Sequence, residues 1–237
     1  MSLLELHRVS KTFGGLHANR DVSFDVAEGE IVGLIGPNGA GKTTLFNCVA
    51  GAFAPSAGSI RMRGREVAGL SPEQSARAGI ARTFQVARTF ASMTACENVL
   101  TAALLMHRSV ARAREQALRW LRFVRLESAA DRPAASLTIS EQRRLAVARA
   151  LAIEPRILLM DEVMAGLTPA EVREAVEVVL AIRGLGIATL IVEHVLEGIM
   201  PIADKIVVLD RGCKIAEGPP AQVSRDPLVI AAYLGDE

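Results

Sequence analysis

Long hydrophobic runs are missing from this sequence. Half of its 237 residues are hydrophobic, yet no apolar run approaches the roughly 18 residues that would predict a membrane-spanning helix. The opening residues, MSLLELHRVSK, also lack the basic-then-apolar order of a signal peptide. We therefore expect a chain that has no transmembrane segment and stays in the cytosol, so that any membrane role is indirect.

Cysteine is scarce, and neither sign of charge dominates. The cysteines Cys48, Cys96 and Cys213 are odd in number, lie far apart and have no histidine at ligand spacing nearby. This pattern supports neither a disulfide framework nor a zinc site. The 27 basic and 26 acidic residues leave a net charge of +1, which provides no overall attraction to nucleic acid or to anionic lipid. We therefore expect no nucleic-acid partner.

The hydrophobic residues that are present form two kinds of strand pattern. Leu3–Val9 and Val22–Val26 alternate apolar with polar residues, as half-buried antiparallel strands do. Later runs are short and almost entirely apolar, which is typical of parallel strands buried on both faces. These runs are Ile31–Ile35, Ile157–Met160, Ile187–Val192 and Ile206–Leu209.

Helical patterns separate the buried runs. Lys42–Ala50, Ser71–Ala78 and Pro169–Arg183 have helical spacing, and Ser71 with Gln74 matches a capping box. Alternation of helices with buried strands predicts an α/β fold with a mostly parallel sheet and an N-terminal antiparallel β region.

A longer helical stretch interrupts the strands between about residues 93 and 125. We predict a single domain over residues 1–237, with a helical subdomain inserted over residues 88–152. The arginines of this stretch form either a solvated helix face, which we favour, or a basic surface for nucleic acid or lipid. They are Arg108, Arg112, Arg114, Arg119, Arg122 and Arg125.

A glycine-rich loop follows the first buried run and precedes a helix. It matches the pattern of a glycine, four free positions and Gly-Lys-Ser/Thr. Its residues are Gly36, Pro37, Asn38, Gly39, Ala40, Gly41, Lys42, Thr43 and Thr44. At a helix N-terminus, free backbone N–H groups and the helix dipole bind an anion. Lys42 can then reach the β- and γ-phosphates of a nucleotide, and Thr43 can offer its hydroxyl to Mg²⁺. The pattern alone does not separate ATPases from GTPases or small-molecule kinases.

Two carboxylates follow the buried run Ile157–Met160. Open α/β sheets bind ligands at the carboxyl ends of their strands, where Asp161 and Glu162 are expected. Asp161 is suited to hold Mg²⁺ through water, and Glu162 to orient or deprotonate the water that attacks the γ-phosphate. The alternative is that the pair caps the next helix.

Three further residues are candidates for the same site. His194 follows the run Ile187–Val192, and Gln85 ends the short segment Ile80–Phe84. Gln85 either binds Mg²⁺ or the attacking water, or is an ordinary polar strand end. Phe13, upstream of the loop, either stacks on adenine or belongs to the core.

These motifs, in this order, resemble the nucleotide-binding subunit of ABC transporters over essentially the whole chain. The corresponding residues are Phe13 for the adenine-stacking aromatic, Gly36–Thr44 for Walker A, Gln85 for the Q-loop, Asp161 and Glu162 for Walker B, and His194 for the switch histidine. The resemblance implies a P-loop NTPase core of the ABC ATPase type that uses ATP and Mg²⁺, with Glu162, His194 and Gln85 as catalytic residues.

Within this family, the chain is most similar to the ATP-binding subunits of branched-chain amino-acid importers, of the G type. The segments that carry this likeness are FGGLHA, IGPNGAGKTTLFN, GIARTFQ, DEVMAGL and EGPPAQV. The resemblance implies two membrane permease subunits, a second and non-identical ATPase subunit, and an external substrate-binding protein, with this chain at the cytoplasmic face of the membrane. A non-transport regulator of the same family, or an ATPase serving another substrate, stays open.

The sequence departs from the family in two loops. The signature Leu-Ser-Gly-Gly-Gln aligns with Leu137–Glu141, where Thr138 keeps a hydroxyl but Ser140 replaces a glycine and Glu141 adds a negative charge. The D-loop, Ala165–Thr168, lacks the family's aspartate. By resemblance, these loops act on the nucleotide of a head-to-tail partner. We therefore hypothesise two unequal ATP sites, with Thr138, Ser140 and Glu141 contacting the partner's nucleotide.

Overall fold

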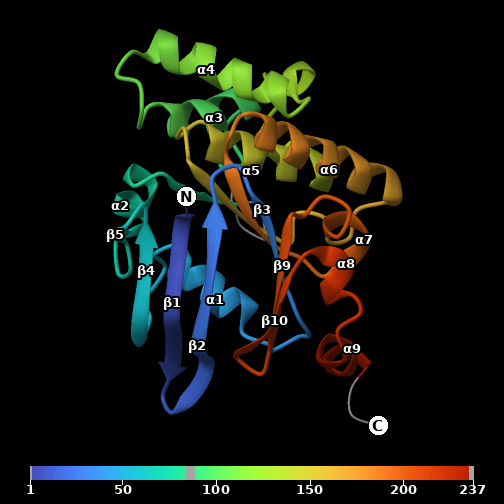
Figure 1. The fold of residues 1–237 in the computed structure, drawn as a ribbon. Coiled ribbons are helices and arrows are strands. Elements are labelled where there is room, and N and C mark those ends of the chain that lie inside the picture. Colours follow the sequence, from blue (N-terminus) through green and yellow to red (C-terminus); the bar gives the residue numbers. More distant parts are fainter. Residues whose placement is uncertain (1, 84–88, 235–237) are drawn as a thin grey trace.

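The computed structural model describes residues 2–83 and 89–234 (Figure 1). Two sheets stand side by side, and a group of helices lies across one end of them (Figure 1). No helix within these residues has the length and apolar character needed to cross a membrane.

The first sheet is antiparallel, with strand order β2-β1-β4-β5. Its strands are β1 (Ser2–Phe13), β2 (Leu16–Ala27), β4 (Ala57–Met62) and β5 (Arg65–Glu66). The antiparallel N-terminal region is therefore confirmed, although β1 and β2 are longer than their apolar patterns predict. Gly14 and Gly15, both at positive φ, connect these two strands in a tight turn.

The second sheet has the strand order β10-β9-β3-β8-β7-β6. Its strands are β3 (Ile31–Ile35), β6 (Ile80–Arg82), β7 (Ile157–Asp161), β8 (Ala188–Val192), β9 (Lys205–Asp210) and β10 (Cys213–Gly218). All neighbours are parallel except β10 and β9. The predicted mostly parallel sheet is confirmed, and each predicted apolar run lies in one of its strands except for Ile187, which precedes β8.

The helices lie between and beside the sheets. They are α1 (Lys42–Val49), α2 (Pro72–Arg77), α3 (Ala95–Ala103), α4 (Val110–Phe123), α5 (Ile139–Leu151), α6 (Pro169–Gly184), α7 (Leu196–Ile199), α8 (Pro220–Val223) and α9 (Pro227–Leu234), with short 3₁₀ helices at Glu127–Ala129 and Ala134–Ser136. The capping box of Ser71 and Gln74 is formed at the start of α2. Helices α3, α4 and α5 pack on one another, whereas the boundaries 88–152 of a helical subdomain stay a prediction.

Two hydrophobic clusters hold these layers together. Alternate residues of β3 enter different clusters: Ile31 and Ile35 face the helices, while Val32 and Leu34 face α1 and the antiparallel sheet. Because α1 is buried between the two sheets, its N-terminus and the loop before it are fixed at the carboxyl end of β3. This position is where a ligand of an open α/β sheet binds.

Candidate functional site

The phosphate loop joins β3 to α1 through three glycines in the left-handed or positive-φ region. Gly36, Gly39 and Gly41 have φ values of 146°, 80° and 94°. A Cβ on Gly36 would lie 2.0 Å from the carbonyl oxygen of Leu209, and one on Gly41 would lie 2.4 Å from that of Ala18. Both positions therefore require glycine for close backbone approach as well as for conformation.

Helix α1 begins without a side-chain cap. Gly41 is its N-cap residue, and no acidic side chain occupies the first turn. The N–H groups at this end are consequently left for a ligand, and the helix dipole favours an anion there.

The ammonium group of Lys42 currently binds the loop itself. Its Nζ donates to the carbonyl oxygens of Gly36 at 2.7 Å and Pro37 at 2.9 Å. Burial lowers the pKa of Lys42, while the nearby carboxylates of Glu162 and Asp161 raise it. A cation held this way in a largely desolvated place is well suited to meet a polyphosphate.

The loop rests on two segments distant in sequence. The fully buried amide of Asn19, in β2, donates to the carbonyl oxygen of Gly41 at 3.1 Å. In the β9–β10 turn, the N–H of Gly212 donates to the carbonyl oxygen of Ala40 at 3.1 Å. The C-terminal helix α9 also reaches the loop. Burial raises the pKa of its Tyr233, and a hydrogen bond with the backbone of Gly36 offsets part of this rise.

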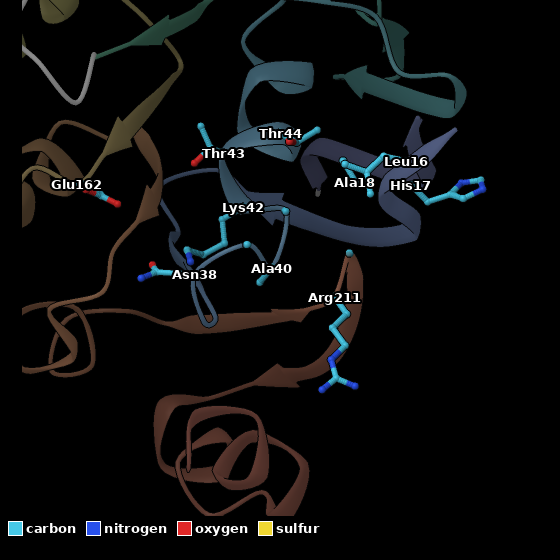
Figure 2. A pocket seen from close by; sticks show the side chains of 13 residues that line it. Leu16, His17, Ala18, Asn38, Ala40, Lys42, Thr43, Thr44, Glu162 and Arg211 are labelled. Atoms are coloured by element: carbon cyan, nitrogen blue, oxygen red, sulfur yellow. The ribbon is translucent and has the colours of Figure 1, made fainter. Parts of the chain in front are cut away.

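A pocket of about 530 Å³ opens over the loop (Figure 2). It is lined by Leu16, His17, Ala18, Asn38, Gly39, Ala40, Gly41, Lys42, Thr43, Thr44, Glu162, Arg211 and Gly212. The hydroxyl of Thr43 and the carboxylate of Glu162 point toward each other in Figure 2, from α1 and from the loop after β7. The structure thus brings the phosphate loop and one predicted carboxylate into one pocket.

Phe13 lies at the rim and not in the core. It pairs with the pocket residue Leu16 across the hairpin and is 45% exposed. Its ring makes an edge-to-face contact with Phe53 at 5.4 Å, and Lys11 lies 5.0 Å from its centroid. Phe13 is not among the described residues that line the pocket, so its stacking on adenine stays a prediction.

Asp161 is the last residue of β7 and is almost completely buried, with 5% of its surface exposed. Burial and the charge of Glu162 raise its pKa, while Arg82 and Lys42 lower it. A buried carboxyl in this condition is stabilised as an anion when a cation binds beside it.

Glu162 and His194 meet across adjacent strands. Oε1 of Glu162 lies 3.7 Å from Nδ1 of His194, and the N–H of Glu162 donates to the carbonyl oxygen of Val192 at 2.9 Å. Glu162 has a φ of 49°, an uncommon conformation for a residue with a Cβ. Backbone strain of this kind is frequent at functional sites.

The residues aligned with the signature loop begin helix α5. Thr138 is the N-cap, and its side chain and that of Glu141 form a reciprocal capping box. Glu141 also pairs with Arg132 at 2.9 Å, and hydrogen bonding to the backbone of Thr138 lowers its pKa. Ser140 is buried, whereas Ile139 is 69% exposed. The N-terminal N–H groups of this helix are therefore partly satisfied by its own side chains.

Some residues of the site were not predicted from the sequence. One predicted residue lies outside the described part of the chain. Gln85 is that residue. His17 lies in the FGGLHA segment but has no predicted role in the site, Arg211 lies in no motif, and both line the pocket only through folding. Glu193 could have been found from the sequence. It is an acidic residue directly after a buried run, which is the same signal that identified Asp161.

Comparison with known proteins gives the class to which this loop, sheet and carboxylate pair belong. Residues 19–165 match the ABC transporter family, and residues 213–237 match the family described as branched-chain amino acid ATP-binding cassette transporter. The chain belongs to the ABC transporter family of ATP-binding cassettes and is an ATPase of that family.

Two curated relatives are similar over nearly their whole length. The high-affinity branched-chain amino acid transport ATP-binding protein BraF of Pseudomonas aeruginosa is 40% identical, and LivG of Escherichia coli K12, of the same description, is 41% identical. Both comparisons cover 99% of this chain and 98% of the relative.

Solved structures agree. A nucleotide-free ATP-binding cassette from an ABC transporter has a TM-score of 0.91 at 30% identity, with both chains fully covered. A dimeric cassette bound to ADP and phosphate has a TM-score of 0.83 at 25% identity, covering 92% of this chain and 98% of the other.

Proposed function

We propose that this chain binds Mg²⁺–ATP in the pocket over Gly36–Thr44 and hydrolyses it to drive import of branched-chain amino acids. The observation that carries the ATPase site is the convergence of Lys42, Thr43 and Glu162 on one pocket at the carboxyl ends of the parallel strands. The similarity to BraF and LivG supports the cargo.

Each residue of the chain has a distinct role in this proposal. Lys42 leaves the carbonyl oxygens of its own loop and binds the β- and γ-phosphates, while the α1 N–H groups hold the phosphate oxygens. Glu162 accepts a proton from the attacking water while the oxygen of that water forms a bond to the γ-phosphorus. The bond to the β–γ bridging oxygen breaks, which leaves ADP and phosphate. His194 orients Glu162 through their 3.7 Å contact.

Oxygen donors suited to Mg²⁺ are present beside the phosphates. The Thr43 hydroxyl and the Asp161 carboxylate are hard ligands of the type that Mg²⁺ binds together with substrate phosphates and water. Gln85 is proposed as a further ligand. When bound by these residues, Mg²⁺ would neutralise the charge that develops on the transferred phosphoryl group.

The proposed assembly has two membrane permease subunits, a second and non-identical ATPase subunit, and an extracytoplasmic substrate-binding protein. This chain is a peripheral subunit at the cytoplasmic face. A dimer of cassettes, as in the similar structure with ADP and phosphate, provides the precedent for paired ATPases.

The test is transport in proteoliposomes. The chain is affinity-purified with its membrane and ATPase partners, and ATP-dependent uptake of leucine, isoleucine and valine is measured with the external binding protein present. We expect uptake of these amino acids and its loss in Glu162→Gln. Robust ATP hydrolysis without uptake of any of the three would contradict the cargo, and an inert wild-type complex would contradict the ATPase site.

A further inference from the structure

A buried carboxyl group stands directly beside the proposed active-site histidine. Glu193 follows β8, precedes His194 and has no exposed surface. Its Oε1 accepts the N–H of Met164 at 2.7 Å, in the loop after β7. Its Oε2 has no partner of ordinary hydrogen-bond geometry among the described residues. A buried, half-satisfied acidic group is costly and calls for a physical explanation.

The carboxyl group joins the two loops that carry the proposed catalytic pair. The loop after β7 contains Glu162 and Met164, and the loop after β8 contains Glu193 and His194. They are linked by the Glu162–His194 contact at 3.7 Å and by the Met164–Glu193 hydrogen bond at 2.7 Å. The two loops are therefore joined at two points, one of them the proposed catalytic pair itself.

Met164 is also held through its side chain. It is fully buried, and its Sδ lies 2.4 Å from where a Cβ on Gly198 of α7 would stand. A Cβ at position 198 would require this sulfur to shift, so the side chain of Met164 packs closely against α7 while its backbone N–H is held by Glu193. The position of the loop is thus fixed at two points.

The groups around Glu193 shift its pKa in opposite directions. Burial raises its pKa, while backbone N–H groups of Met164, Val195 and His194 and the charge of His194 lower it. Glu193 thus accepts a hydrogen bond from the loop after β7, and the charge of His194 acts on it from the loop after β8.

We propose that Glu193 is a positioning residue for ATP hydrolysis, which holds the Met164 N–H and thereby sets the placement of Glu162 relative to His194. This inference rests on the roles proposed above for those two residues. Glu193 does not contact the nucleotide pocket, since it is absent from the described residues that line it. It should therefore affect turnover and not ATP affinity.

The test compares three substitutions in the full complex with its partner subunits. Glu193→Leu keeps an apolar volume but removes the acceptor, Glu193→Gln keeps an acceptor oxygen, and Thr189→Val is the matched control. Thr189 lies on β8, the strand that ends just before Glu193, is fully buried, and has a hydroxyl without a partner among the described residues. For Glu193→Leu we expect kcat to fall about 10- to 100-fold, because small misplacements of a catalytic group have effects of this size. KM for ATP should stay within about threefold of wild type.

Glu193→Gln should recover at least about half of the wild-type kcat, and Thr189→Val should resemble wild type. Thermal unfolding identifies any variant that fails to fold, and Glu193→Ser, which is smaller and polar, then replaces Glu193→Leu. A folded Leu or Ser variant with wild-type kcat overturns the inference, as does a Gln variant as slow as the Leu variant. Turnover that survives Glu162→Gln would instead overturn the proposed function.

Discussion

Oε1 of Glu162 lies 3.7 Å from Nδ1 of His194, although the two residues are separated in sequence by helix α6 and strand β8. Their strands β7 and β8 are parallel neighbours, with Asp161 beside Val192. The sheet therefore brings a carboxylate and an imidazole to one point, next to the pocket in which we propose that ATP binds. A phosphate-binding turn alone has no such pair, so this contact is the feature that favours hydrolysis in the proposed site.

Removing either partner should slow hydrolysis without preventing binding. We expect Glu162→Gln to lower kcat about 100-fold or more and His194→Ala about 10- to 100-fold, because a proton acceptor or its orienting group is lost. Binding of a fluorescent ATP analogue should stay within about threefold of wild type, since the phosphate loop is unchanged. Loss of binding in proportion to kcat would show that these residues hold the nucleotide instead.

The phosphate loop offers a matched pair of glycines. Both Gly39 and Gly41 have positive φ, but a Cβ on Gly39 meets nothing within 4 Å, whereas one on Gly41 would lie 2.4 Å from the backbone of Ala18. Gly39→Ala should cost about 1–2 kcal/mol from backbone conformation alone. Gly41→Ala should destabilise the fold further and abolish ATP binding. Unfolding in urea and nucleotide titration measure both effects, and equal behaviour of the two variants would contradict the steric argument.

Most of the fold is readable from local patterns. The run Ile31–Ile35 is strand β3 with the predicted bounds, because a fully buried strand is apolar along its whole length. The hairpin of β1 and β2 extends beyond its alternating segments because backbone pairing continues through polar residues such as Lys11 and Thr12. Pairing of this kind depends on the partner strand and cannot be recognised from the pattern of hydrophobic residues.

The site is predictable where a motif is continuous and hidden where the fold assembles it. Lys42 and Thr43 follow from the loop pattern, and Asp161 and Glu162 from their place after a buried run. Asn19 supports the loop through a single tertiary hydrogen bond, and no sequence signal marks it. Polar residues at strand ends give the same pattern in the sequence, and only their burial in the fold distinguishes them.

The cap of α5 gives a pH-dependent contribution to stability. Hydrogen bonding to Thr138 and the Arg132 pair lower the pKa of Glu141. A depressed folded-state pKa means that the stabilisation is complete above the unfolded value of about 4.3 and is lost as pH falls through the folded value. Glu141→Gln should therefore cost about 0.3–1 kcal/mol near pH 7, and the difference from wild type should shrink below about pH 4.

The measurement is urea unfolding between pH 3.5 and 7, a range chosen to span roughly the ordinary carboxyl pKa. Glu115→Gln on α4 is the control, since Glu115 is exposed and forms no ion pair in the part of the chain that the structure describes. A constant difference between Glu141→Gln and wild type across this range would show that the carboxylate charge contributes nothing.

The same cap predicts unequal ATP sites in a mixed pair of subunits. At the start of α5, the carboxylate of Glu141 accepts the Thr138 N–H and places a negative charge there, and Ile139 projects from the surface with 69% exposure. A polyphosphate brought to this helix by a partner would meet repulsion in place of free donors. The cap of α5 does not alter this chain's own site around Lys42 and Glu162. Turnover should therefore occur mainly at this chain's own phosphate loop, completed by the partner's signature.

Mixed complexes test this inequality directly. Glu162→Gln in this chain should abolish most ATP hydrolysis, whereas the matching substitution in the partner should remove much less. Replacing Ile139 and Ser140 by Gly and Glu141 by Gln should raise hydrolysis at the partner's loop, because backbone donors and close approach are restored. Equal losses from the two Glu→Gln substitutions would contradict the asymmetry, because a capped α5 would then serve the partner's nucleotide as well as an open one.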